Sequence, residues 1–198
     1  MDYLIHLIQV AGYWGYALLF LVIFLESLPF AFFLPGDSLL FTTGFLAVQG
    51  YFNLGALFVV MFVASVLGYF ASYAVGKKFR HLVLEKHDHF WFKRKHLEKT
   101  QAFFAKYGRK TIILGRFIGI VRSFAPTLAG AAEMQYTEFT RDSVLGAIFW
   151  VGGFLSVGFY LGKAFPGAHL YLTPFILAVI FVSLIPALYE YVRSRKNK

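Results

Sequence analysis

The stretch "LGRFIGIVRSFAPTLAG", residues 114–130, combines features that rarely occur together. Most of its side chains are apolar, yet it carries two arginines, Arg116 and Arg122, and a proline, Pro126. A charged side chain at the centre of a bilayer costs about 2.5–3.5 kcal/mol on insertion scales. Irregular backbone at that depth is tolerated where it lines a protein cavity. We therefore expect a broken segment whose arginines face protein and not lipid.

The composition of the whole chain indicates a membrane protein. Of its 198 residues, 59% are hydrophobic, whereas an ordinary soluble domain is about 45–50% apolar. A core of this size cannot hide the excess, so lipid must cover part of the surface. We expect one membrane domain, residues 1–198. The absence of cysteine excludes disulfides and thiolate metal sites.

The distribution of positive charge favours a membrane protein over a nucleic-acid-binding one. The net charge is +9, but eleven of the nineteen Lys and Arg residues lie in 77–110 and four more in the last six residues. Basic clusters that flank apolar spans are typical of cytoplasmic loops. We expect no nucleic-acid partner, and we read 77–110 as a basic amphipathic segment on the inner leaflet.

The apolar runs predict the topology by parity. Their approximate bounds are 10–28, 30–48, 54–76, 111–131, 143–162 and 171–189. The basic segment and the basic tail should both be cytoplasmic, so an even number of crossings must separate them. Because 111–131 holds the arginines and the proline, we expect it to re-enter from the cytoplasmic side without crossing.

The first half contains a similar broken segment that carries acids. The stretch "FLESLPFAFFLPGDSLLFTTG", residues 24–44, holds Glu26 and Asp37 around the turn pair Pro35-Gly36. Asp37 is also a good helix N-cap, which is its alternative, purely structural role. If this segment re-enters from the outer side, both termini of the chain are cytoplasmic.

Two glycine spacings suggest an internal repeat. Gly44 and Gly76 are separated by 32 residues, as are Gly130 and Gly162. The second glycine of each pair begins a similar motif, "GKKF" at 76–79 and "GKAF" at 162–165.

The predicted fold is an all-α polytopic membrane protein resembling inverted-repeat transporters. It has about four spanning helices and two re-entrant broken helices. Its first half is 10–76, its cytoplasmic segment 77–110 and its second half 111–165. A last span with a basic tail follows at 171–198.

The charged residues in the broken segments suggest a binding site for phosphate. On one continuous helix Arg116 and Arg122 would point about 120° apart. A break favoured by Gly119 and Pro126 could bring both guanidinium groups to one point. Arginine presents a planar fork of donors suited to phosphate. Glu26 and Asp37 could pair with the arginines or exchange protons, and structural ion pairs are the alternative.

No pattern predicts a metal, a cofactor or an enzyme. The histidines of the basic segment lack a clear metal-ligand spacing; they are His81, His87, His89 and His96. The chain has no nucleophile elbow, P-loop or HExxH motif.

Three motifs together resemble the DedA membrane proteins of the wider VTT, or SNARE-associated, group. They are "ESLPFAFFLPGDSLLFTTGFLAVQG", "GRFIGIVRSFAPTLAGAAEM" and "GAIFWVGGFLSVGFYLG", and the resemblance covers about residues 12–165. It implies two facing re-entrant segments and lipid translocation, either of undecaprenyl phosphate or of phospholipids, with proton-motive force in several members. The family's functional acids and arginines match Glu26, Asp37, Arg116 and Arg122. The hairpin positions are Pro35, Gly36, Gly119, Pro126 and Gly130.

The chain departs from the family pattern at three positions. Gly119 stands where the family usually has proline, and Tyr69 where it usually has an acid. Arg80 replaces a turn glycine. Tyr69 replaces the carboxyl group that the family usually has at this position, so a scheme of ion coupling that uses this acid does not carry over to the chain.

We expect a non-enzymatic lipid transporter of the bacterial cytoplasmic (inner) membrane, a flippase or scramblase. Its partners would be protons and a phosphate-headgroup lipid, foremost undecaprenyl phosphate. Two alternatives remain open: a proton-coupled exporter of small cations or drugs, and a membrane scaffold that works through 77–110. The oligomeric state is open too, a homodimer included.

Overall fold

The computed structural model describes residues 2–29, 34, 36–85 and 94–165. Several predictions fall outside these residues: Pro35, the last apolar run at 171–189, the basic tail, and His87 and His89.

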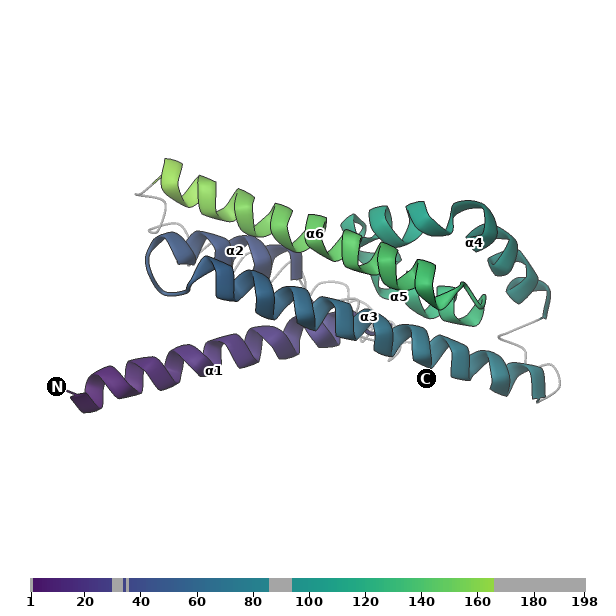
Figure 1. Ribbon diagram of the computed structural model, residues 1–198, viewed down its shortest axis with the longest axis horizontal. Coiled ribbons are helices and arrows are strands. Elements are labelled where there is room, and N and C mark those ends of the chain that lie inside the picture. The colour runs from purple at the N-terminus through teal and green to yellow at the C-terminus, as the bar shows by residue number, and fades with distance from the viewer. Residues whose placement is uncertain (1, 30–33, 35, 86–93, 166–198) are drawn as a thin grey trace, which may run out of the picture. The chain divides into compact units, whose positions relative to one another are not determined.

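Helices are the only regular elements in the described parts of the chain (Figure 1). They are α1 (Asp2–Glu26), α2 (Gly36–Val48), α3 (Leu54–Glu85), α4 (Arg94–Leu114), the short 3-10 helix η1 (Gly115–Phe117), α5 (Gly119–Ala131) and α6 (Tyr136–Ala164). The prediction of an all-helical protein is confirmed for the described residues.

Two of the described helices are long and apolar enough to cross a bilayer, namely Leu54–Lys78 of α3 and Tyr136–Ala164 of α6. Gly12–Glu26 and Gly36–Val48 are shorter apolar helices. Large apolar side chains on the long helices lie exposed, among them Val59, Phe149 and Tyr160. Such an exposed apolar surface is unusual for a soluble monomer.

The chain forms two compact units, each described here by itself. Unit 1 comprises the described residues of Met1–Val22, Phe33–Met61 and Val151–Lys198. In it α2 packs closely on α6: a Cβ added at Gly44 would overlap the Leu155 carbonyl, and one at Gly158 would overlap the Phe41 carbonyl. Only glycine permits this approach of two backbones.

Unit 2 comprises Ile23–Phe32 and Phe62–Trp150, and its described part repeats the same kind of packing. A Cβ at Gly130 would overlap the Tyr73 carbonyl of α3, and one at Gly76 would overlap the Thr127 carbonyl of α5. Gly76 therefore plays the part that Gly158 plays in unit 1. The spacing had matched Gly76 with Gly162, one helical turn further along.

The core of unit 2 is largely aromatic. The rings of Tyr73 and Phe139 lie 4.5 Å apart between centroids, and Tyr69 stacks on Phe139 at 6.5 Å. Phe104 and Ile112 of α4 are buried in the same cluster. Helix α4 is thus anchored to unit 2 through one apolar face, while Phe103 and Tyr107 remain exposed.

The arginine-bearing segment is broken between the two arginines, next to Gly119 and not at Pro126. After η1, Ile118 is extended, with φ −118° and ψ 106°, and α5 begins at Gly119. Pro126 lies inside α5 without ending it, so the prediction that it favours the break is wrong. A proline there forfeits one backbone bond, to the carbonyl four residues earlier, yet α5 continues to Ala131.

Candidate functional site

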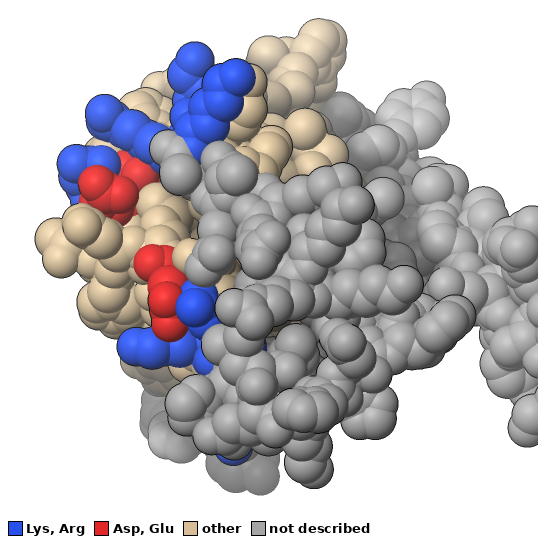
Figure 2. All heavy atoms as spheres, turned by 90° about the vertical axis from the view of Figure 1, so that its right-hand side faces the viewer, with Lys and Arg blue, Asp and Glu red and all other residues tan. Residues whose placement is uncertain are grey.

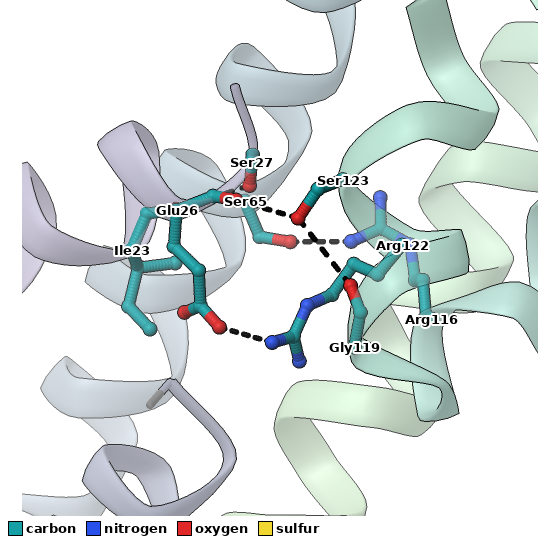
Figure 3. Close-up of polar contacts among 8 residues, drawn as sticks. All are labelled: Ile23, Glu26, Ser27, Ser65, Arg116, Gly119, Arg122 and Ser123. Atoms are coloured by element: carbon teal, nitrogen blue, oxygen red, sulfur yellow. Dashed lines mark hydrogen bonds and ion pairs between the residues drawn. The ribbon is translucent and has the colours of Figure 1, made fainter. Parts of the chain in front are cut away.

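Glu26 and Arg122 form a buried ion pair. Glu26 is the last residue of α1 and Arg122 lies in the first turn of α5. Arg122 Nη2 donates to Glu26 Oε1 (Figure 3). Their exposed fractions are 1% for Glu26 and 3% for Arg122. The Arg122 guanidinium also lies 4.7 Å from the centre of the Trp150 ring of α6.

Hydroxyl groups from α3 and α5 bind the backbone carbonyls at the end of α1, where Glu26 lies. A helix end leaves carbonyl groups without partners in the helix, and burial makes them costly. Ser123 Oγ donates to the Glu26 carbonyl at 3.4 Å, and Ser72 Oγ donates to the Ser27 carbonyl at 2.6 Å. Gly68 of α3 lets the end of α1 approach, because a Cβ there would lie 2.8 Å from the Phe24 carbonyl oxygen. The end of α1 can therefore remain buried next to Arg122.

Arg116 is fully buried and is held by neutral groups. Its Nη1 donates to Ser65 Oγ at 2.5 Å, and its Nη2 donates to the Ser143 carbonyl at 3.2 Å. The guanidinium lies 3.5 Å from the centre of the Tyr69 ring, a favourable cation–π distance. Gly146 leaves room for the side chain, since an added Cβ would lie 3.0 Å from Cδ and Nε of Arg116.

The two arginines therefore differ in their charge partners. Arg122 has a carboxylate, whereas Arg116 forms no ion pair with any acid in the described part of the chain. The positive charge of Arg116 is therefore not balanced by an ion pair among the described residues. An uncompensated buried cation is costly, and a site that keeps one is suited to an anionic ligand.

The other predicted site residues lie in α2 and α5. Gly36 and Asp37 are in the first turn of α2, in unit 1. An acid in a first turn interacts favourably with the helix dipole. Gly119 starts α5, and a Cβ added there would meet nothing within 4 Å. Gly119 thus has no close neighbour that requires it, unlike Gly130.

Two further sets of charged side chains form ion pairs of their own. Arg80 pairs with Glu133 at 2.8 Å, and Asp142 accepts from Arg141 at 3.0 Å with Arg109 3.6 Å away. Basic side chains, with acidic ones beside them, gather on the described part of the face shown in Figure 2. The pair of Arg80 and Glu133 is partly exposed, so it contributes little to stability.

Sequence reasoning missed the groups that hold the arginines, although helical spacing could have found them. Small and polar residues recur on α3 at intervals of four, three and four, which places them on one face of a helix: Ser65, Tyr69, Ser72 and Gly76. On α6 the corresponding series is Ser143, Gly146 and Trp150. We had interpreted Tyr69 only as the loss of an acid.

Comparisons with known proteins agree with this picture of a membrane protein. The VTT domain model matches residues 34–160. The chain is 38% identical to protein DedA of Escherichia coli K12, over 99% of this chain and 94% of that protein. It is 36% identical to an uncharacterized membrane protein of Mycobacterium tuberculosis H37Rv, over 94% and 85%. With the E. coli inner membrane protein YqjA the identity is 31%, over 75% and 68%.

No solved structure matches the chain. The domain match covers more than half of the chain, and the similarity to protein DedA extends over nearly all of it. The chain therefore belongs to the DedA family of membrane proteins, and it carries that family's VTT domain.

Proposed function

We propose that the protein is a lipid transporter, a flippase or scramblase, that moves a phosphate-headgroup lipid across the cytoplasmic membrane. The observation that carries the proposal is Arg116, a fully buried guanidinium without a carboxylate partner in the described part of a membrane protein. Arginine stays charged when desolvated and matches the geometry of phosphate oxygens. Undecaprenyl phosphate is the substrate we favour, on the family resemblance.

The charge of Arg116 supports an anionic substrate over a cationic one. The Arg116 guanidinium would repel a cation, and Glu26 already pairs with Arg122. A cation exporter that used Glu26 would have to break this ion pair and hold its substrate beside the charge of Arg116. The lipid's apolar chain could stay in the bilayer while only the headgroup enters the protein.

Helix lengths support two re-entrant helices among the spanning ones. Helices α2 and α5 have 13 residues each, which corresponds to about 20 Å at 1.5 Å per residue. A bilayer core is about 30 Å thick. Neither helix can cross it, whereas α3 with 32 residues and α6 with 29 residues can. Equal length and equivalent glycine packing support α2 and α5 as corresponding elements of a repeat.

Coupling to the proton-motive force would operate through Glu26. Protonation of this carboxylate would cancel its attraction for Arg122, which could then share the headgroup with Arg116. Asp37, in the first turn of α2, remains a predicted second gating acid. The proposal includes an inner-membrane location with both termini in the cytoplasm, and transport without an enzymatic step.

Reconstitution into phosphatidylcholine vesicles tests the proposal. Undecaprenyl phosphate would be loaded into the inner leaflet, and external phosphatase would report its arrival outside. We expect the wild-type protein to accelerate arrival and Arg116→Gln to abolish the acceleration. Lys106→Gln, which removes an exposed charge from α4, is the matched control and should transport normally.

The outcomes separate the candidate functions. Full transport by a folded Arg116→Gln variant would disprove the role of Arg116. No transport of this lipid or of phosphatidylethanolamine, together with uptake of small cations against a pH gradient, would favour the exporter. Normal arginine variants and loss of function on removing Phe103 and Tyr107 would favour the scaffold.

A further inference from the structure

Three buried polar groups around Arg116 have no hydrogen-bond partner in the described part of the chain. They are Arg116 Nε, the Tyr69 hydroxyl and Ser143 Oγ. All three residues are completely buried. A buried polar group without a partner costs about 1–3 kcal/mol, so three around one side chain require an explanation.

The contacts of Arg116 bring these groups to one place. The Tyr69 ring lies against the guanidinium from α3, and the Ser143 backbone accepts a bond from it on α6. All three groups can donate: a guanidinium N–H, a phenol O–H and an alcohol O–H. Donors around an uncompensated positive charge are suited to the oxygens of an anion.

Resting on the function proposed above, we infer that Arg116, Tyr69 and Ser143 together form the phosphate site of the state in which Arg122 is paired with Glu26. Tyr69 and Ser143 would each donate a hydrogen bond to a phosphate oxygen while Arg116 supplies the charge. In this closed state Arg122 keeps its bond to Glu26 (Figure 3). Because the three residues are fully buried, the phosphate reaches them only in a more open conformation.

Tyr69 and Tyr73 provide a matched pair of variants on α3. They are one helical turn apart, and both rings pack on Phe139. The Tyr73 hydroxyl donates to the Met134 carbonyl at 2.6 Å, whereas the Tyr69 hydroxyl has no partner among the described residues. Tyr73→Phe should therefore lower the melting temperature and leave phosphate affinity unchanged. Tyr69→Phe should weaken phosphate binding without lowering the melting temperature, because its hydroxyl has no partner among the described residues.

The experiment measures binding of dodecyl phosphate to the purified protein by calorimetry, with inorganic phosphate as a second probe. A hydrogen bond to a charged group corresponds to about tenfold or more in affinity. We expect Tyr69→Phe and Ser143→Ala each to weaken binding by about that factor without lowering the melting temperature. Tighter binding of dodecyl phosphate than of inorganic phosphate would identify a lipid headgroup as the source of the anion, and equal binding would identify free phosphate.

The inference and the proposed function fail in different ways. If the wild-type protein transports phosphate lipid and Tyr69→Phe and Ser143→Ala keep wild-type affinity, the site is wrong and the function stands. If Tyr69→Phe lowers the melting temperature as much as Tyr73→Phe, its hydroxyl is structural and the inference is overturned. If the wild-type protein neither binds nor transports any phosphate, both are wrong.

Discussion

Breaking the ion pair between Glu26 and Arg122 should cost far more stability than breaking the pair between Arg80 and Glu133. The side chains of the first pair are 2% and 4% exposed, so little solvent can screen an unpaired charge. Removing one partner of such a pair costs about 3–5 kcal/mol. At about 2–4 °C per kcal/mol for a chain of this size, Glu26→Ala should lower the melting temperature by about 6–20 °C.

The control pair is exposed on one side, because the Glu133 side chain is 54% exposed. Arg80→Ala should therefore cost only about 0–1 kcal/mol. The assay is thermal unfolding of the purified protein in one detergent. The double variant Glu26→Met with Arg122→Met should recover most of the loss, since a buried pair can be replaced by apolar groups. A Glu26→Ala variant no less stable than Arg80→Ala would refute this reasoning.

Three further predictions concern the backbone around the site. Gly146→Val should sharply reduce lipid transport by displacing Arg116, because the new Cβ would lie 3.0 Å from Cδ and Nε of Arg116. Gly153→Val is the control and should transport normally, since an added Cβ there meets nothing within 4 Å. Equal transport rates of the two variants would contradict this. Gly119→Ala should keep wild-type transport because its Cβ also meets nothing within 4 Å, and a loss would show that this hairpin needs a glycine. Glu133 has a φ of 57°, so Glu133→Gly should be about 1 kcal/mol more stable than Glu133→Ala, and equal melting temperatures would argue against strain there.

Much of the helical framework could be predicted from hydropathy, but not the ends of the helices. The apolar run at 54–76 predicts α3, yet the helix continues to Glu85. Likewise α4 extends to Leu114, into the run assigned to the re-entrant segment. Apolar runs mark where a helix meets an apolar environment, and a helix can continue beyond it wherever the residues favour one.

The charged residues could be predicted as a group, but not their pairing. Glu26 and Arg122 are 96 positions apart. No local sequence pattern predicts which arginine pairs with such a distant carboxylate. The sequence offered two breakers, Gly119 and Pro126, and no local pattern decided between them. The chain turns at Ile118, next to Gly119, and Pro126 lies within α5.

The most direct test of the central claim compares two lipids that differ only in the charge of the headgroup. Both carry the same fluorescent acyl chain, one with a phosphate monoester and the other with a trimethylammonium group, and dithionite quenching reports their transfer in vesicles. The account predicts that the wild-type protein accelerates the phosphate lipid alone and that Arg116→Gln removes the acceleration. Faster transfer of the trimethylammonium lipid, or equal transfer of both, would contradict it.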